Sequence, residues 1–279
     1  MRANKIMALA YKGKTLLWAG SPLMNWDSHN RDNSYRKYDE TYCKRAADAL
    51  GEALKLTEKT GRYELAPFEN FNDIFLLHNS SGKIPGLKEA ILQENLAEYN
   101  GRWAWNMNTD FRSQRMIPSG IKCWPTANYS SYFGMANGYP ISDMSKSDTE
   151  SGYDATHPWK GRDPRFYKTY VIDGEFCGTS GIGETAMLYT GGADREKANP
   201  QKGCYTGLMN AKLCLKSVNN ANVRDTYFFV LSLMRLADVY LMYSEATAVG
   251  YGVKTGTSQF NMTAEQAINK IRERAGVAN

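Results

Sequence analysis

The chain has 279 residues, which is enough to bury a sizeable core, and its formal net charge is only +5. It contains no block of five consecutive lysines or arginines and no run of eighteen apolar residues. A nucleic-acid partner is therefore not expected, and no segment is expected to span a bilayer. The five cysteines form an odd set without C-x-x-C spacing, which argues against a zinc ribbon and excludes a complete disulfide framework. A bond between Cys204 and Cys214 stays open, because spacing alone does not set disulfide geometry.

Helical periodicity marks the N-terminal part of the chain. Residues 2–19 place apolar side chains near one side, and Ser21-Pro22 is expected to end this helix. A second helix is predicted from about residue 40 to 59, with an alanine-rich inner face and Gly61 as its stop. Two such helices resemble one tetratricopeptide-type unit, which cannot bury its own apolar face and needs further helices to complete the stack.

The middle of the chain loses this periodicity and becomes rich in glycine, asparagine and aromatic residues. The clearest case is the segment 99–138, whose aromatic content argues against disorder and whose length is typical of functional loops. Residues 83–96 fit a strand or a helix equally well by their period. We also expect two short strands, at 167–172 and 213–218, and a glycine-rich loop at 178–192.

The C-terminal part predicts an αα-hairpin. Residues 235–246 (RLADVYLMYSEA) and 268–275 (INKIRERA) both carry apolar side chains at three- and four-residue steps. Thr263 and Gln266 have the spacing of a capping box before the second helix. A glycine-rich run joins the two helices, as in other αα-hairpins.

These patterns predict a mainly α fold, in which tetratricopeptide-like helical hairpins accompany a long irregular, aromatic-rich lobe with a few short strands. We expect a single domain over residues 1–279. Helical hairpins at 2–60 and 226–279 would flank the loop-rich lobe at 61–225.

No catalytic or metal site is predicted. The three histidines, His29, His78 and His157, lie in polar or loop settings, and none belongs to an H-E-x-x-H motif. The sequence has no G-x-S-x-G elbow, P-loop or dinucleotide fingerprint, so no cofactor is expected either. A glycosidase pair of carboxylates depends on a separation in space that sequence does not give.

The tryptophans of the irregular lobe are the candidates for ligand contact. Indole rings stack on the C–H faces of sugars, while nearby amide and guanidinium groups bond the hydroxyls. Four tryptophans lie in loops with small polar neighbours: Trp103, Trp105, Trp124 and Trp159. Their rings would also fit a core beneath long loops, and we expect two of the four to face a ligand or a partner. The candidate ligand-binding residues are Trp103, Trp105, Asn106, Arg112, Trp124 and Trp159.

Two charged motifs are expected to hold the fold. In residues 162–166 (RDPRF), Arg162 and Arg165 are expected to pair with carboxylates and pin an extended loop before a strand. Asp163 precedes a proline and is therefore held out of the α region. In the C-terminal hairpin, Arg235 and Asp238 are expected to form a local pair. The remaining residues of this structural group are Glu245, Asn269, Arg272 and Arg274.

Four segments of the chain, in the same order, resemble one protein family. Residues 4–22 resemble its alanine- and leucine-rich helix, and residues 125–138 (PTANYSSYFGMANG) resemble its P-T segment. Residues 162–166 match its R-D-P-R-F motif, and 235–246 with 268–276 match its helix pair. The family is SusD/RagB, the surface nutrient-binding lipoproteins of Bacteroidetes that partner TonB-dependent transporters.

The resemblance implies a function without catalysis. It implies capture of a glycan or other nutrient oligomer, above all an oligosaccharide, and its delivery to a SusC-like TonB-dependent outer-membrane transporter. The implied location is the extracellular face of the outer membrane, with membrane contact only through a lipid anchor that this chain does not contain. Both ends of the family pattern are missing, so we expect an internal piece of a longer protein. Ser130, Ser131 and Asn137 replace the family's valine and two aspartates, which removes both of those acidic groups.

Three alternatives stay open at this point. The same scaffold would capture oligopeptides if it offered a deep polar cleft able to bond an extended backbone. It would be a helical protein–protein adaptor if it had a concave groove and no solvent-facing tryptophan. It would be a glycoside hydrolase if two carboxylates faced each other across a cleft.

Overall fold

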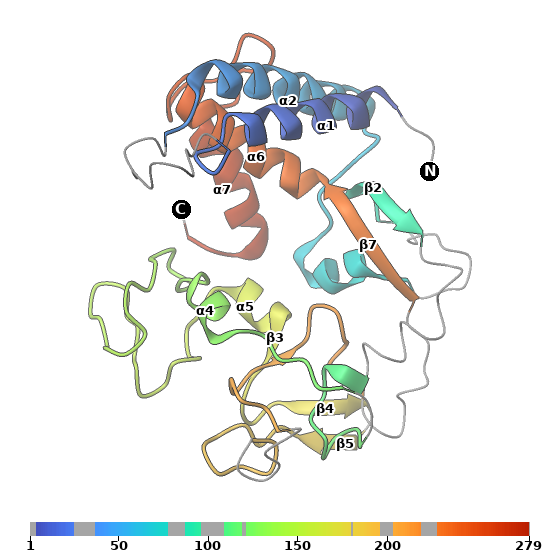
Figure 1. Ribbon diagram of the computed structural model, residues 1–279, viewed down its shortest axis with the longest axis vertical. Coiled ribbons are helices and arrows are strands. Elements are labelled where there is room, and N and C mark those ends of the chain that lie inside the picture. Colours follow the sequence, from blue (N-terminus) through green and yellow to red (C-terminus); the bar gives the residue numbers. More distant parts are fainter. Residues whose placement is uncertain are drawn as a thin grey trace. The chain divides into compact units, whose positions relative to one another are not determined.

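The computed structural model describes most of the chain (Figure 1). The described residues are 4–24, 37–77, 87–95, 109–118, 121–179, 181–195, 203–218 and 228–278. They form two compact units. The helical unit takes Met1–Pro67, Gly86–Glu94 and Ser232–Arg274, and the loop-rich unit takes Phe68–Pro85, Asn95–Leu231 and Ala275–Asn279.

The helical unit contains the four long helices that the sequence predicts. Their bounds are α1 (Lys5–Ala19), α2 (Glu40–Thr60), α6 (Leu236–Gly250) and α7 (Ala264–Ala275). The side chain of Asp39 accepts hydrogen bonds from two backbone N–H groups at the start of α2. Gly61 ends α2 in the left-handed region, at φ 57°, as the sequence predicts. The mainly helical fold class is therefore confirmed.

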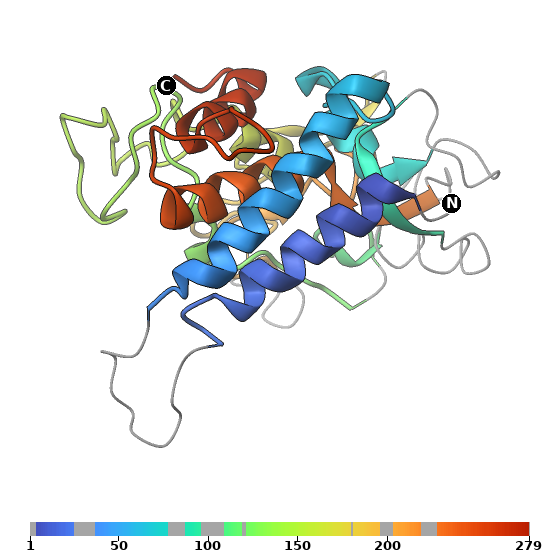
Figure 2. The same ribbon diagram turned by 90° about the horizontal axis from the view of Figure 1, so that it is seen from above.

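Small residues allow α1 and α2 to lie side by side (Figure 2). Ala46, Ala47 and Ala53 of α2 are fully buried, as is Leu50. A Cβ atom added to Gly13 of α1 would lie 2.4 Å from Cγ of Leu50. No side chain larger than hydrogen fits at residue 13, so the backbone of α1 lies directly against the Leu50 side chain of α2. Close contact of this kind gives a helix pair rich in alanine and glycine a densely packed core.

The predicted capping box of α7 is present. The backbone N–H of Thr263 donates to Oε1 of Gln266 at 2.9 Å, and the N–H of Gln266 donates to Oγ1 of Thr263 at 3.1 Å. The hydroxyl of Tyr243 on α6 donates to the carbonyls of Phe260 and Met262 in the segment that leads into α7. The connection between the two helices is therefore fixed from inside the core.

A buried carboxylate organises the helical unit. Glu89 has no exposed surface, and its two oxygens accept from Nη1 of Arg235 at 3.2 Å and Nη1 of Arg274 at 2.7 Å. It also accepts the backbone N–H of Ala66 at 2.8 Å. Arg235 reaches Asp238 as well, at 3.3 Å. The two motif arginines of the C-terminal hairpin thus meet at one acid that lies far away in sequence, and we call this group the Glu89 cluster.

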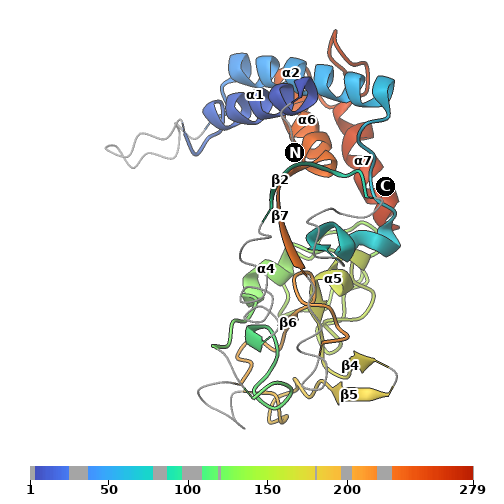
Figure 3. The same ribbon diagram turned by 90° about the vertical axis from the view of Figure 1, so that its right-hand side faces the viewer.

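The loop-rich unit has short elements only. They are η2 (Phe68–Phe75), β1 (Leu76–Leu77), α4 (Ala127–Ser131), α5 (Pro164–Thr169), β3 (Tyr170–Val171), β4 (Phe176–Thr179), β5 (Ile182–Thr185) and β6 (Met209–Asn210). Strands β3 and β6 pair antiparallel, and β4 and β5 form a hairpin (Figure 3). Two longer strands are not confined to the loop-rich unit: β2 (Ala90–Asn95) belongs almost wholly to the helical unit, and β7 (Phe228–Arg235) has residues in both. The three-stranded sheet has the order β1-β7-β2.

Three expectations about this region need correction. The predicted strand at 167–172 is mostly the end of α5, and only Tyr170 and Val171 are extended. The predicted loop at 178–192 contains β5 and the end of β4, where Gly178 and Gly183 face each other across the hairpin. No strand forms at 213–218; the short strand β6 lies just before it. These errors share a cause, because a window of about six residues is too short for its periodicity to distinguish a strand from a short helix or a turn.

Five thiols are free in the structure, so Cys204 and Cys214 are not bonded. Both lie with Cys177 in one buried cluster of the loop-rich unit, while Cys123 is exposed. Burial raises the pKa of the Cys214 thiol to about 11. These buried cysteines therefore act as small apolar residues of the core.

Candidate functional site

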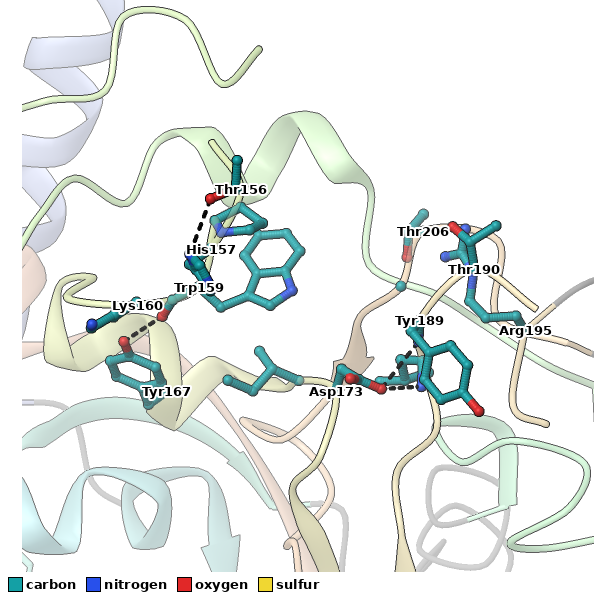
Figure 4. A pocket seen from close by; sticks show the side chains of 14 residues that line it. Thr156, His157, Trp159, Lys160, Tyr167, Asp173, Tyr189, Thr190, Arg195 and Thr206 are labelled. Atoms are coloured by element: carbon teal, nitrogen blue, oxygen red, sulfur yellow. Dashed lines mark hydrogen bonds between the residues drawn. The ribbon is translucent and has the colours of Figure 1, made fainter. Parts of the chain in front are cut away.

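A pocket of about 800 Å³ lies in the loop-rich unit. This volume is within the range of pockets that bind small ligands, ~300–1,000 Å³. Figure 4 shows its lining residues in two groups, which we call the Trp159 wall and the Tyr189 wall. The Trp159 wall consists of Thr156, His157, Pro158, Trp159, Lys160 and Tyr167. The Tyr189 wall consists of Ile172, Asp173, Leu188, Tyr189, Thr190, Arg195, Thr206 and Gly207.

The ring of Trp159 is fixed by stacking on another aromatic ring. Its ring lies 5.5 Å from that of Phe166, with an angle of 22° between the planes. The guanidinium of Arg162 lies over the ring of Phe166, 4.5 Å from its centroid. Cation–π and ring–ring contacts of this kind restrict how a side chain can turn. The indole is therefore preorganised before any ligand arrives.

Arg162 holds the loops that build the Trp159 wall. It is 1% exposed, and its guanidinium donates four hydrogen bonds to backbone carbonyls. The acceptors are the carbonyl oxygens of Gly134, Pro158, Ser130 and Phe133, at 3.4, 2.9, 2.6 and 2.6 Å. Burial lowers the pKa of this guanidinium, though an arginine stays charged at any ordinary pH. The expected pairing of Arg162 with a carboxylate is wrong, because irregular backbone supplies its acceptors instead.

The rest of the R-D-P-R-F motif starts helix α5. Asp163 accepts the backbone N–H of Arg165 at 2.8 Å, with Pro164 at the first helical position. The guanidinium of Arg165 returns to the same carboxylate at 2.5 Å, which is the pairing expected from the sequence. The extended loop expected there is a short helix. Tyr167 then donates its hydroxyl to the carbonyl of Trp159 at 2.5 Å, so the motif also fixes the backbone of the wall.

The Tyr189 wall is fixed by a carboxylate. Oδ1 of Asp173 accepts the backbone N–H groups of Leu188 and Tyr189, at 2.6 and 3.1 Å. These bonds present the phenol ring of Tyr189, which is 57% exposed. Asp173 lies in the Asp-Gly turn after β3, and two backbone donors are the usual partners of a carboxylate that shapes a loop. The wall therefore offers an aromatic ring next to a charged group.

Arg195 is also part of the Tyr189 wall. Its Nη1 donates to the carbonyl of Tyr205 at 3.1 Å. Gly207 has φ +73°, and a Cβ atom added there would lie 3.0 Å from Nη1 of Arg195. Glycine at this position serves both a backbone conformation that other residues rarely adopt and the close approach of a guanidinium.

The predicted ligand residues have different fates. Trp159 lines the pocket. Trp124 is half-buried and packs against the buried cluster that contains the three core cysteines, so it is a core residue of the loop-rich unit. Trp103, Trp105 and Asn106 lie outside the described residues.

The expected ligand contact of Arg112 is contradicted by its burial. Arg112 has no exposed surface, and it donates to five backbone carbonyls at 2.6–3.4 Å. The acceptors belong to Phe111, Asn210, Cys214, Leu215 and Val218. Its donors are thus directed at the loops around it, in the same way as those of Arg162.

Three pocket residues were missed by sequence reasoning: Tyr189, Asp173 and Arg195. Tyr189 lies in a segment that its glycines marked as a loop, and an aromatic residue among small neighbours was the available signal. Asp173 lies in an Asp-Gly turn, where aspartate is common for reasons of backbone geometry, so it gave no specific signal of a pocket. Arg195 gave no local signal, because it reaches the pocket through contacts with residues 205–207.

The structural group of the C-terminal hairpin is partly explained by contacts. Glu245 of α6 accepts the hydroxyl of Tyr38 at 2.8 Å, and this bond raises the pKa of Tyr38 to about 12. Asn269 and Arg272 are half-buried on α7. Among the described residues, no group of three or more His, Cys, Asp or Glu side chains is placed to hold a metal ion. Within the same residues, no helix is long and apolar enough to cross a membrane.

The chain is similar to one family of sequences and to several solved structures. A model of the SusD family matches residues 88–279. The solved structure of BT4246 is 23% identical and superposes with a TM-score of 0.62 over 100% of this chain. A SusD-like protein of Bacteroides fragilis (BF3747) is 21% identical with a TM-score of 0.56, and it matches 96% of this chain. A SusD-like carbohydrate binding protein of the same species (BF0978) is 18% identical with a TM-score of 0.55, again over 96%.

These structures show a shared fold. The chain spans about half of each of them, namely 55%, 52% and 50% of their lengths. No curated protein matches the sequence.

Proposed function

Because this chain belongs to the SusD family, as its sequence resemblance predicted, we propose that it captures oligosaccharides at the bacterial cell surface without changing them chemically. The observation that carries the proposal is the pocket, in which the rings of Trp159 and Tyr189 lie on two walls. Threonine hydroxyls and a carboxylate accompany the rings. Sugars need this mixture, because their C–H faces stack on rings while their hydroxyls form hydrogen bonds.

Delivery to a SusC-like TonB-dependent outer-membrane transporter is the second part of the proposal. It is supported by family membership, since SusD proteins are associated with the outer membrane of Bacteroidetes. Weak binding suits such a role, because a captured sugar must be released again. Weak binding is also expected physically, since sugars give up well-hydrated hydroxyls when they bind.

Observations on the pocket and on α1 weigh against two alternatives. A glycoside hydrolase needs two facing carboxylates, whereas Asp173 is the only carboxylate among the described residues that line this pocket. Its Oδ1 is already occupied by two backbone donors. A helical adaptor would have no solvent-facing tryptophan, whereas Trp18 on α1 is 62% exposed. Oligopeptide capture by the same scaffold is left as an outcome of the experiment.

The proposal is tested by isothermal titration of the full-length protein against a panel of oligosaccharides and a panel of oligopeptides. We expect at least one oligosaccharide to bind, and we expect Tyr189→Ala to weaken it about tenfold or more through loss of a stacking ring. Trp159→Phe should weaken it as well, while its smaller ring keeps part of the packing on Phe166.

The matched control is Tyr132→Ala. Tyr132 is 84% exposed in the same unit but does not line the pocket, so its loss should leave affinity unchanged. Absence of binding to every oligosaccharide, together with tight binding of a peptide, would overturn the proposal. Equal weakening by Tyr132→Ala and Tyr189→Ala would show that the pocket is not the site.

A further inference from the structure

A second pocket, of about 540 Å³, lies next to the first in the loop-rich unit. Its volume is again within the ~300–1,000 Å³ of pockets that bind small ligands. Tyr167 of α5 lines both pockets, so the two are neighbours. We call the second one the Glu69 pocket. Its lining comes from η2, α5 and the segment after β6, and consists of Glu69, Asn72, Asp73, Pro164, Tyr167, Lys168, Leu215 and Lys216.

Hydrogen bonds link the linings of the two pockets. Lys216 of the Glu69 pocket donates to Oε1 of Glu175 at 2.6 Å. Oε2 of the same carboxylate accepts, at 3.0 Å, the backbone N–H of Ile172, which lines the first pocket. The hydroxyl of Tyr167 donates to the carbonyl of Trp159. The residues between the pockets are therefore held in place, and the two linings keep a fixed separation.

The Glu69 pocket contains a buried hydrogen-bond acceptor. Asn72 donates its Nδ2 to the carbonyls of Lys168 and Ala211, at 3.1 and 2.8 Å, and these two bonds define which atom of the amide is the oxygen. Its Oδ1 is buried and accepts no hydrogen bond from the described part of the chain. A buried acceptor without a partner is unfavourable, and a hydroxyl group of a ligand would supply that partner.

Glu69 adds an exposed acceptor to the same pocket. Its backbone carbonyl accepts Nζ of Lys168 at 3.0 Å, whereas its carboxylate forms no hydrogen bond or ion pair with a described residue. Hydrogen bonds from sugar hydroxyls to a carboxylate are charge-assisted and roughly twice as strong as neutral ones. Pro164 and Leu215 supply apolar surface beside these acceptors. The Glu69 pocket therefore offers both kinds of contact that a sugar uses.

We infer that the Glu69 pocket is a second subsite for the same ligand, so that one neutral oligosaccharide lies across Tyr167 with units in both pockets. The inference rests on the proposed function, because it extends the site proposed there. The lining of the Glu69 pocket carries two lysines and two carboxylates, which suits a ligand without net charge. A longer chain then binds more tightly than a shorter one, because its further units form contacts without a second loss of overall freedom of motion.

Isothermal titration of the full-length protein with oligosaccharides of increasing length tests the inference. The ligands are malto-, xylo- and manno-oligosaccharides from disaccharide to octasaccharide, together with a size series of every other oligosaccharide that binds in the first panel. In at least one series we expect affinity to rise about tenfold or more once the chain is longer than the first pocket can hold, with one chain bound per protein. A longer chain also has more ways to occupy a single pocket, but that part of the rise does not depend on Glu69.

The variant Glu69→Ala assigns the gain to the second pocket. The shortest chains that bind should bind as before, which would show that the first pocket is intact. The longest chains should lose about fivefold or more of their affinity, because a charge-assisted bond is removed. Glu69→Gln keeps an uncharged acceptor and should retain part of the gain. Glu150→Ala is the matched control, since Glu150 is exposed in the same unit and lines neither pocket.

Hydrogen–deuterium exchange locates the bound chain without a variant. An octasaccharide of the binding series should slow exchange in η2 as well as in the walls of the first pocket. The shortest chain that binds should slow exchange in the first pocket alone.

The outcomes separate this inference from the proposed function. Equal affinity at every length, or a gain that is undiminished in Glu69→Ala, would overturn the second subsite alone. Two short chains bound per protein, with no gain for longer ones, would also overturn it, because the pockets would then bind separate ligands. Equal weakening of short and long chains by Glu69→Ala would do the same. Binding of no oligosaccharide of any length would overturn both proposals.

Discussion

Both units must provide partners for their buried polar groups, and they do so in opposite ways. In the helical unit the long helices pair backbone N–H groups with backbone carbonyls, and the buried charge of Glu89 pairs with the side chains of Arg235 and Arg274. In the loop-rich unit the backbone is irregular, and the buried arginines Arg112 and Arg162 donate to its carbonyls. Arginine can do this because its planar group carries five donors in a fixed arrangement.

The difference explains why the pocket lies where it does. Loops carry ligand-binding residues because they can take many shapes, but they must be held in one shape to bind well. Arg162 fixes the loops behind Trp159 without a regular sheet or helix, through bonds to residues 130–134 and 158. The comparison teaches that the loop-rich unit relies on side-chain donors where the helical unit relies mainly on the hydrogen bonds of its long helices.

The largest effect should follow from removal of Arg162. In Arg162→Met, buried carbonyls lose their donors at a cost of ~1–3 kcal/mol each, so the loop-rich unit should lose about 4 kcal/mol or more. We expect its near-ultraviolet circular dichroism to collapse while the far-ultraviolet signal of the long helices persists.

Two controls sharpen this result. Arg162→Lys should not restore stability, because an ammonium group cannot reach several carbonyls at once. Arg165→Met removes a half-exposed arginine of the same motif and should cost much less. An Arg162→Met protein that unfolds no more easily than Arg165→Met would contradict the role given to Arg162.

The second effect concerns the Glu89 cluster. Glu89→Ala leaves two arginines, whose side chains are only 14% and 10% exposed, without their shared acid and should destabilise the helical unit by about 3 kcal/mol. The triple variant Glu89→Leu, Arg235→Met and Arg274→Met should recover most of that stability, since a buried ion pair is often replaceable by apolar packing. Urea unfolding followed by far-ultraviolet circular dichroism measures both. A triple variant as unstable as the single one would show that the cluster does more than neutralise its own charges.

The third effect is a loss of stability of the loop-rich unit at alkaline pH. The folded pKa of Cys214 is raised by burial to about 11, so its contribution to stability is full below the unfolded value near 9. That contribution should be lost as the pH rises through 11, by about 2.7 kcal/mol in total for two pKa units. Cys214→Ala should flatten the alkaline decline of the loop-rich unit in thermal melts at pH 8 to 11. Cys123→Ala, at an exposed thiol, should leave the decline unchanged, and an equal response of the two variants would refute the assignment.

The smallest effect belongs to the helical unit. Thr263→Ala removes one half of the capping box of α7 and should cost about 1 kcal/mol. Thr263→Ser keeps the hydroxyl and should behave like the native protein. A change in the midpoint of urea unfolding measures the effect, and a cost below a few tenths of a kcal/mol would mean that α7 is held by packing alone.

The sequence predicted the helical unit well because its signals are local. The stop at Gly61 and the box at Thr263 depend on neighbours three or four residues away. The meeting of Arg235 with Glu89 was not predictable, since 146 residues separate them. The role of Arg112 was missed for the same reason, because four of its five acceptors lie about a hundred residues further along the chain.

The candidate site, too, was predictable only where its signal was local in the sequence. Trp159 was predicted because a tryptophan in a polar loop is a local signal. The rest of the pocket depends on where two loops meet, which no single window of sequence records. Tyr189 and Arg195 were therefore found only in the structure.

The most direct test of the account is hydrogen–deuterium exchange of the full-length protein with and without a saturating concentration of the tightest oligosaccharide of the panel. Slower exchange in residues 156–167 and 187–195 is the predicted result, because these segments build the two walls of the pocket. Exchange in α1 and α2 should not change. Protection confined to α1 and α2, with no change in either wall, would contradict the placement of the binding site in the loop-rich unit.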